Sequence, residues 1–132
     1  MVKKYFTVEE ANELLPYVKS ELTFLQKTKA EFYQKYHELQ ALKKQTSGQS
    51  AAEIESAVFA LECSLEFLEL ELRLHIERIQ EKGIQLKDID LGLFDFPAFV
   101  DGREVLLCWK QGEPAVLHYH GLDEGFLGRK SL

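Results

Sequence analysis

Two histidines near the C-terminus provide the first candidate chemistry. His118 and His120 are two residues apart in a segment that we expect to be a β-strand, so their side chains point the same way about 7 Å apart. Such pairs occur in zinc sites, where Glu113, Asp123 or His75 would have to supply a third ligand. The alternative is structural, with His118 at the end of an apolar face and His120 hydrogen-bonded to a carboxylate or carbonyl. We expect the structural role, and therefore no metal and no other cofactor.

The two cysteines suggest packing and not catalysis. Cys108 lies in an apolar segment beside Trp109 without an identifiable base, so we expect no catalytic thiolate. Cys63 and Cys108 are far apart in sequence and neither belongs to a Cys-x-x-Cys pair, which is typical of free thiols in a reducing compartment. The sequence has no nucleophile elbow, phosphate-binding loop or dinucleotide-binding motif. We predict no catalytic residue, and a non-enzymatic protein is favoured over an enzyme.

Charged and ionisable residues gather in the second half of the chain. They are Asp95, Arg103, Glu113, His120, Asp123 and Arg129. If several of them converge at one end of a sheet, they form a polar pocket for an anionic or polar small ligand. The alternative is a set of separate surface salt bridges at turns. The candidate ligand-binding residues are Arg103, Glu113, His120, Asp123 and Arg129.

Composition limits the class of protein. The chain has 132 residues, 45% of them hydrophobic, which fits a single folded domain over residues 1–132. A net charge of −6 argues against nucleic acid as a partner. No apolar stretch is long enough to span a membrane and the N-terminus lacks a secretory signal. We therefore expect a cytoplasmic protein without a nucleic-acid or membrane partner.

Two long helices are expected to position these residues. Thr7-Val8-Glu9-Glu10 matches a capping box, and Pro16 should separate a short helix over about 8–15 from a long one. An apolar stripe follows at steps of four and three, with Lys29 as its one break. Its members are Val18, Leu22, Leu25, Phe32, Tyr36 and Leu39. The polar segment 45–50 is expected to be the tip of a hairpin.

The second helix begins at another capping box, Ser50-Ala51-Ala52-Glu53, and its stripe continues to Gly83, which is expected to cap it. This stripe consists of Ile54, Val58, Leu61, Leu65, Leu68, Leu72, His75 and Ile79. His75 thus occupies a core position, where a hydrogen-bonded or register-setting histidine is more common than a ligand. The two helices form an antiparallel, coiled-coil-like hairpin over residues 7–82.

The second helix also carries another apolar row on its opposite face. This row consists of Ala60, Cys63, Phe67, Leu70 and Leu74. One packed neighbour cannot cover both faces of a helix, and each helix would be on the order of 50 Å long, more than a short sheet spans. We favour a second copy of the chain, giving a homodimer or a higher oligomer, over coverage by the sheet. The row is therefore our candidate interface, for a second copy or for another protein.

After Gly83 the periodicity changes to that of strands. Segments 94–100 and 103–109 are joined by Asp101-Gly102, a two-residue hairpin turn. This turn pairs Ala98 with Val105, Phe96 with Leu107 and Phe94 with Trp109. Segment 115–120 adds a third strand and 84–87 is a candidate fourth, with Pro97 expected on an edge strand. The prediction is an α+β fold in which the hairpin precedes a three- to four-stranded antiparallel β-meander and a C-terminal tail over residues 83–132.

Several short motifs along the whole chain are those of a known family. They are Tyr5-Phe6-Thr7, Glu10-Ala11-Asn12, Leu14-Leu15-Pro16, Gly92-Leu93, Asp95-Phe96-Pro97, Gly102-Arg103, Leu107-Cys108-Trp109, Gly112-Glu113-Pro114, His120, Gly125-Phe126 and Gly128-Arg129. With these motifs the chain resembles the bacterial family catalogued as domain of unknown function 2203. The resemblance implies a bacterial cytoplasmic protein and carries no activity or catalytic residue. The characteristic histidine of that family corresponds to His120 and not to His118, which argues against a His118/His120 metal pair.

Overall fold

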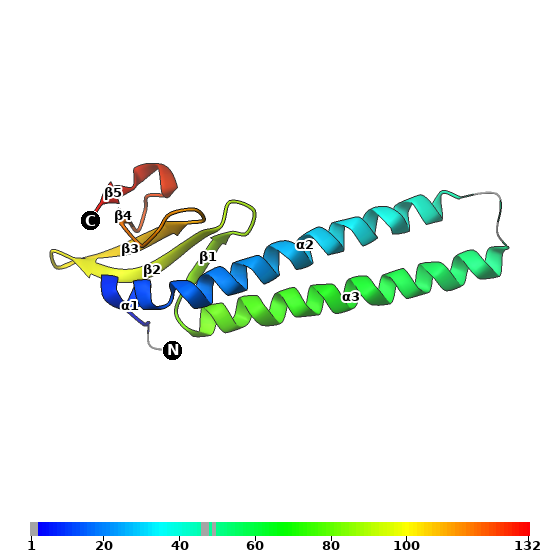
Figure 1. Cartoon of the computed structure of the whole chain (residues 1–132), viewed down its shortest axis with the longest axis horizontal. Coiled ribbons are helices and arrows are strands. Elements are labelled where there is room, and N and C mark those ends of the chain that lie inside the picture. The colour runs from blue at the N-terminus through cyan, green and yellow to red at the C-terminus, as the bar shows by residue number, and fades with distance from the viewer. Residues whose placement is uncertain (1–2, 46–47, 49) are drawn as a thin grey trace. The chain divides into compact units, whose positions relative to one another are not determined.

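The computed structural model describes residues 3–45, 48 and 50–132. The chain forms two compact units. One is Phe24–His75, and the other joins the N-terminal residues up to Thr23 to Ile76–Leu132. The first unit is purely helical, whereas the second contains the β-sheet together with the ends of the helices (Figure 1).

The described residues form three α-helices, of which the first and the third begin where the capping motifs predict. They are α1 (Val8–Glu13), α2 (Leu15–Lys43) and α3 (Ala51–Glu81). The Glu10 N–H donates to Thr7 Oγ1 at 3.0 Å and the Thr7 N–H donates to Glu10 Oε1 at 2.9 Å, and these bonds hold the pKa of Glu10 below its usual value. The Glu53 N–H donates to Ser50 Oγ at 3.1 Å, which confirms the second cap. Pro16 lies in the first turn of α2, where no donor is lost.

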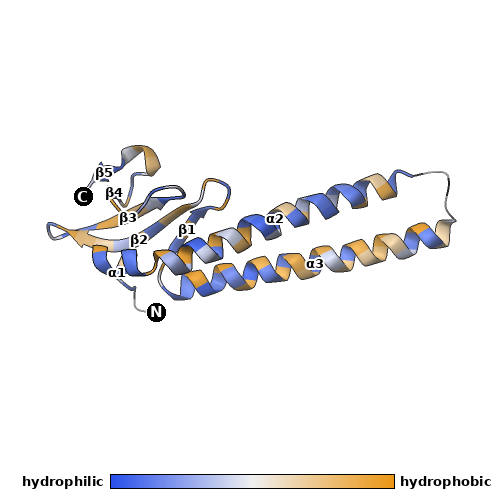
Figure 2. Ribbon diagram, in the orientation of Figure 1, coloured by the Kyte–Doolittle hydropathy of each residue, from blue (hydrophilic) through white to orange (hydrophobic). Residues whose placement is uncertain are grey.

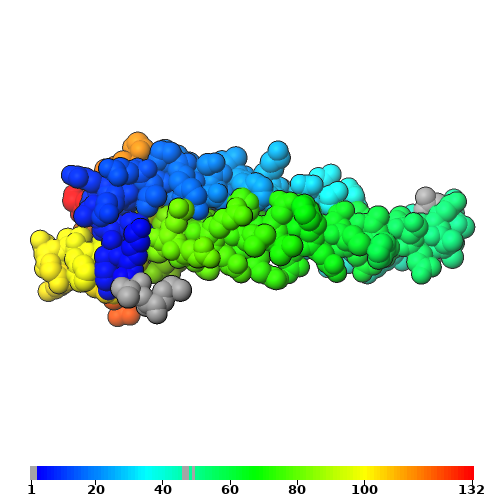
Figure 3. All heavy atoms as spheres, turned by 90° about the horizontal axis from the view of Figure 1, so that it is seen from below, coloured from blue at the N-terminus to red at the C-terminus, as the bar shows by residue number. Residues whose placement is uncertain are grey.

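The helical unit consists of antiparallel α2 and α3, which lie side by side in both views (Figures 1 and 3). Leu25, Leu39, Leu65 and Leu68 are buried, as the stripes predict. The stripe of α2 is wrong at one place, because Tyr36 is 42% exposed whereas Thr28 is buried. The buried side of α2 that faces α3 continues from Leu25 to Thr28, three residues later, so Lys29 does not interrupt it. The predicted tip includes residues 46, 47 and 49, which lie outside the described residues.

Across the described part of the chain, the sheet has five antiparallel strands in the order β1-β2-β3-β4-β5. They are β1 (Gln85–Asp88), β2 (Leu93–Val100), β3 (Arg103–Lys110), β4 (His118–Gly121) and β5 (Lys130–Ser131). The register of β2 and β3 is the predicted one. Asp101 and Gly102 have φ values of 51° and 77°, as a tight hairpin turn requires. Gly83 has a φ of 89° and ends α3 as expected.

Three details of the sheet differ from the prediction. A fifth strand is present, because residues 130–131 return to pair with β4. The strand β4 begins at His118 instead of residue 115, since the Val116 N–H donates to Asn12 Oδ1 at 2.7 Å and so leaves the ladder. Pro97 lies on an inner strand and not on the predicted edge strand, but β1 pairs with β2 only as far as Asp95. The missing N–H of Pro97 therefore breaks no bond to β1, and its carbonyl oxygen accepts a bond from the Phe6 N–H at 2.7 Å.

One face of the sheet forms the core of its unit. Phe94, Phe96, Ala98, Val105, Leu107 and Trp109 are all buried there, as predicted from the register. Phe6 meets Phe96 edge to face at 5.5 Å between ring centroids, and Leu22 of α2 approaches Gly92. This face is therefore filled by apolar side chains.

Candidate functional site

The second face of the sheet carries a row of polar residues. Asp95 of β2 lies opposite Cys108 of β3, and Cys108 lies opposite His118 of β4. Because side chains alternate along a strand, these three point away from the aromatic core. His120, two residues after His118, shares their face and lies opposite Leu106. The C-terminal segment, with the short 3₁₀ helix η1 (Phe126–Gly128), follows β4 beside this part of the sheet (Figure 1).

His120 and Asp95 form a buried pair. Their side chains are 3% and 4% exposed, and His120 Nε2 lies 3.1 Å from Asp95 Oδ2. His120 Nδ1 lies 2.9 Å from the carbonyl oxygen of Gly121, which can only accept, so Nδ1 carries a hydrogen. A second proton must then lie between Nε2 and Oδ2. His120 is therefore hydrogen-bonded to both a carbonyl and a carboxylate, as the structural alternative for this residue predicts.

Cys108 completes this buried cluster without being an activated nucleophile. The ligand atoms of Asp95, Cys108 and His120 all lie within 4.8 Å of one another, and all three residues are buried. Burial, together with the Asp95 carboxylate, raises the pKa of Cys108 to about 12, against a smaller lowering by Arg129. Both ring nitrogens of His120 already have oxygen partners. The cluster has the composition of a Cys-His-Asp triad but not its hydrogen bonding.

The two thiols should differ sharply in reactivity, because both are free, Cys63 is exposed and Cys108 is buried. At a protein concentration low enough to keep the chain monomeric, iodoacetamide at pH 8 should modify one thiol of the native protein, at Cys63. With a pKa of about 12, the thiolate fraction of Cys108 is on the order of one in ten thousand. Both thiols should react once urea unfolds the chain. Mass spectrometry of peptides identifies the modified residue, and rapid native labelling of Cys108 would contradict the buried placement.

A second polar group surrounds Glu113, in the turn between β3 and β4. Arg129 Nη1 donates to both carboxylate oxygens of Glu113, at 2.9 and 3.0 Å. His118 Nδ1 lies 3.2 Å from Glu113 Oε2, within ion-pair distance. The Trp109 Nε1–H donates to the backbone oxygen of Glu113 at 3.0 Å. Glu113 thus links this turn to the C-terminal segment and to the aromatic core.

The predicted ligand-binding residues are placed in three ways. Glu113 and Arg129 are in direct contact, and His120 lies in the neighbouring cluster with Asp95. Arg103 is exposed at the β2–β3 turn, and Asp123 is exposed after β4. Ligand binding by these residues stays a prediction. His118 and His120, the less favoured metal pair, face different carboxylates, those of Glu113 and Asp95.

Sequence reasoning missed Cys108 as a partner of Asp95 and His120. The signal was present, because the Asp101-Gly102 turn that pairs Phe94 with Trp109 also pairs Asp95 with Cys108. A cavity of about 220 Å³ opens beside this cluster. Its lining adds Lys87, Leu93, Leu106, Leu122, Glu124, Gly125 and Phe126 to the three buried residues. The cluster is thus buried yet adjoins a space large enough for water or a small ligand.

The helical unit has a surface of a different kind. All five residues of the second apolar row of α3 are exposed, with Phe67 at 60%, Leu70 at 48% and Leu74 at 43%. Hydrophobic residues recur along this helix in Figure 2. His75, on the seam, stacks on Phe24 with ring centroids 4.0 Å apart.

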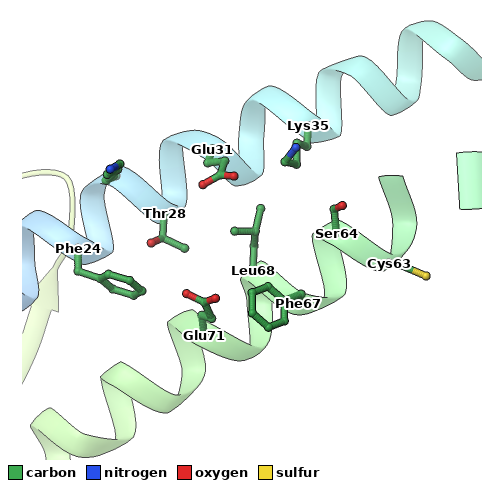
Figure 4. A pocket seen from close by; sticks show the side chains of 10 residues that line it. Phe24, Thr28, Glu31, Lys35, Cys63, Ser64, Phe67, Leu68 and Glu71 are labelled. Carbon is green, nitrogen blue, oxygen red and sulfur yellow. The ribbon is translucent and has the colours of Figure 1, made fainter. Parts of the chain in front are cut away.

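A groove of about 620 Å³ runs between α2 and α3, with Phe67 and Cys63 among its lining residues. Thr28 points into it from α2, whereas Leu68 and Glu71 point into it from α3 (Figure 4). Cys63 points away from the space between the helices (Figure 4). Lys27 and Lys35 of α2 and Glu31 and Glu71 add charges of both signs to the lining. The groove and the exposed row thus form one continuous surface.

Comparison with known proteins gives the family. Among the described residues, no helix is both long enough and apolar enough to cross a membrane. No curated protein and no solved structure matches the chain significantly. The family model described as "Uncharacterized conserved protein (DUF2203)" matches residues 4–132. Because this match covers nearly all of the 132 residues, the chain belongs to the DUF2203 family, as its motifs indicate.

Proposed function

We propose that this protein is a non-enzymatic interaction protein that self-associates through its helical hairpin. The observation that carries the proposal is the exposed apolar row on α3. Phe67, Leu70 and Leu74 expose 60%, 48% and 43% of their surface and fall on one face of the helix. A contiguous apolar strip of this kind is typical of a protein interface. We further propose a cytoplasmic location, which is supported by two free thiols.

Charge favours a second copy of the chain as the occupant of this strip. Over residues 51–75, α3 carries six glutamates and one arginine. Over residues 24–43, α2 carries four lysines and two glutamates. Two α3 helices would repel each other, whereas α3 of one copy and α2 of another attract. In a four-helix bundle that alternates α2 and α3, each acidic helix has only basic neighbours.

The partner's α2 also offers apolar surface for this contact. Tyr33 and Tyr36 on α2 are 51% and 42% exposed, and aromatic side chains of this kind are enriched at interfaces. Lys29 lies over the Tyr33 ring at 6.0 Å, so the basic and aromatic surfaces of α2 are adjacent. The groove beside Phe67 provides a recess for a partner side chain. The proposed dimer is symmetric, because each copy contributes one α2 and one α3 surface.

The expected result is a dimer at micromolar concentration by native mass spectrometry. A Leu70→Glu variant should weaken the dimer by at least about 30-fold, because it places a charge within the row, between Phe67 and Leu74. Leu127→Glu is the matched control, since Leu127 is 98% exposed in the C-terminal segment, and it should leave the dimer intact. A monomeric wild-type protein, or equal weakening by both variants, would overturn the proposal.

Salt tests which helices meet. Pairing of α3 with the partner's α2 should weaken as sodium chloride rises from 0.05 to about 0.5 M, since salt screens the attraction of opposite charges. Pairing of two α3 helices should instead strengthen, because salt screens their repulsion. Light scattering over a dilution series at both salt concentrations measures the dissociation constant. A tighter dimer at high salt would contradict the alternating bundle.

A further inference from the structure

The cluster of Asp95, Cys108 and His120 has the donors of a transition-metal site. The three residues come from three neighbouring strands and are 3%, 2% and 3% exposed. They offer one oxygen, one sulfur and one nitrogen, all within 4.8 Å of one another. Ligands on a tetrahedral zinc ion, at bond lengths of 2.0–2.3 Å, lie about 3.3–3.8 Å apart. Small side-chain rotations are thus enough to bring these atoms around one ion.

The orientation of His120 is already that of a metal ligand. Its Nδ1–H donates to the Gly121 carbonyl at 2.9 Å, which leaves the lone pair of Nε2 directed at Asp95. Ligating histidines almost always hold their second nitrogen in this way, and the bond fixes the tautomer and the ring plane. The backbone of β4 therefore already holds the His120 ring in the orientation of a metal ligand.

Charge balance also fits a divalent ion. Without metal, the cluster holds a thiol and one proton shared by His120 Nε2 and Asp95 Oδ2. A divalent cation that displaces these two protons leaves a thiolate, a carboxylate and a neutral imidazole around it. The net charge of the buried group is then zero before and after binding, which avoids the large penalty of burying a charge. Arg129, which also approaches Cys108, is offset by both oxygens of Glu113.

We propose that Asp95, Cys108 and His120 bind a divalent transition-metal ion, with zinc as the expected occupant. Sulfur and nitrogen donors select zinc and related ions over magnesium and calcium. The fourth position faces the cavity of about 220 Å³, where water or a small ligand completes the tetrahedron. This proposal departs from the expectation of no cofactor, because that expectation did not include Asp95 and Cys108 among the donors. It is independent of self-association.

The test is a titration of the full chain, prepared without an affinity tag and freed of metal with a chelator. Cobalt(II) is the probe, because a cobalt–thiolate bond gives a sulfur-to-metal charge-transfer band. We expect this band to saturate at one equivalent of cobalt and to disappear on addition of zinc. Magnesium should have no effect. A wild-type protein that gives no band with one equivalent of cobalt would overturn the proposal.

Variants identify the ligands. Cys108→Ser should abolish the band, whereas the matched variant Cys63→Ser should keep it. His120→Gln should weaken zinc binding at least about 100-fold, whereas His118→Gln should leave it unchanged. Circular dichroism of each variant verifies that the fold is retained. Persistence of the band in Cys108→Ser, or its loss in Cys63→Ser or His118→Gln, would show that the ion binds elsewhere and overturn the assignment.

Discussion

Replacing Asp95 by alanine is expected to lower the free energy of unfolding by about 3–5 kcal/mol. Asp95 and His120 are buried, and Nε2 lies 3.1 Å from Oδ2. The substitution removes the partner of His120 Nε2 and leaves this buried nitrogen without a hydrogen bond, which is strongly destabilising. Urea unfolding of the metal-free protein, followed by circular dichroism, gives the free energy.

A double-mutant cycle separates this pairing from simple loss of packing. His120→Leu removes the partner, so the Asp95→Ala/His120→Leu protein should be about as stable as the worse single variant, or more stable. Asp123→Ala is the control, because Asp123 is exposed, and it should change stability by less than about 0.5 kcal/mol. Additive losses from Asp95→Ala and His120→Leu would show that the two side chains do not interact.

Replacing Trp109 by alanine should also cost about 3–5 kcal/mol, the usual range for a large buried aromatic residue. Trp109 is 1% exposed and lies opposite Phe94, with ring centroids 6.1 Å apart. The variant also loses the Nε1–H bond to the Glu113 carbonyl, of 3.0 Å. Trp109 is the only tryptophan of the chain, so unfolding must be followed by circular dichroism instead of fluorescence.

Two further variants test how much of the loss of stability comes from burial of Trp109 and how much from its hydrogen bond to Glu113. Phe99→Ala is the matched control on the same hairpin, because Phe99 is 56% exposed, and we expect a loss below about 1 kcal/mol. Trp109→Phe keeps most of the apolar volume but removes the donor to Glu113, so its cost should be intermediate. If Trp109→Ala and Phe99→Ala were equally destabilising, the assignment of the two faces of the sheet would be wrong.

The sequence predicts most of this fold because its strongest signals are local. Two capping boxes mark the starts of helices, and one two-residue turn sets the register of eight residue pairs. The aromatic face of the sheet follows from that register without further information. The second apolar row of α3 likewise follows from helical periodicity, and each of its members is exposed.

The parts that sequence reasoning missed depend on contacts between distant segments. The late start of β4 depends on Asn12, which is 104 residues away from Val116. The buried stripe of α2 passes through Thr28 instead of Lys29, because both positions fit the helical spacing and the contact with α3 decides between them. His120 joins Asp95 and Cys108 only when β4 pairs with β3, and no local pattern contains that pairing. Local sequence patterns therefore indicate the histidine pair and not the buried cluster.

The division into two units has a consequence for how the chain acquires its structure. The helical unit Phe24–His75 is continuous in sequence, whereas the sheet unit combines both ends of the chain. Contacts between α2 and α3 close short loops, but Lys3 reaches Glu104 across 101 residues. During synthesis from the N-terminus, we expect the hairpin to form on the emerging chain while the sheet waits for the last strands. Residues 3–23 would then remain unpacked until β2–β5 have been synthesised, so a chaperone would meet the apolar side chains of this segment.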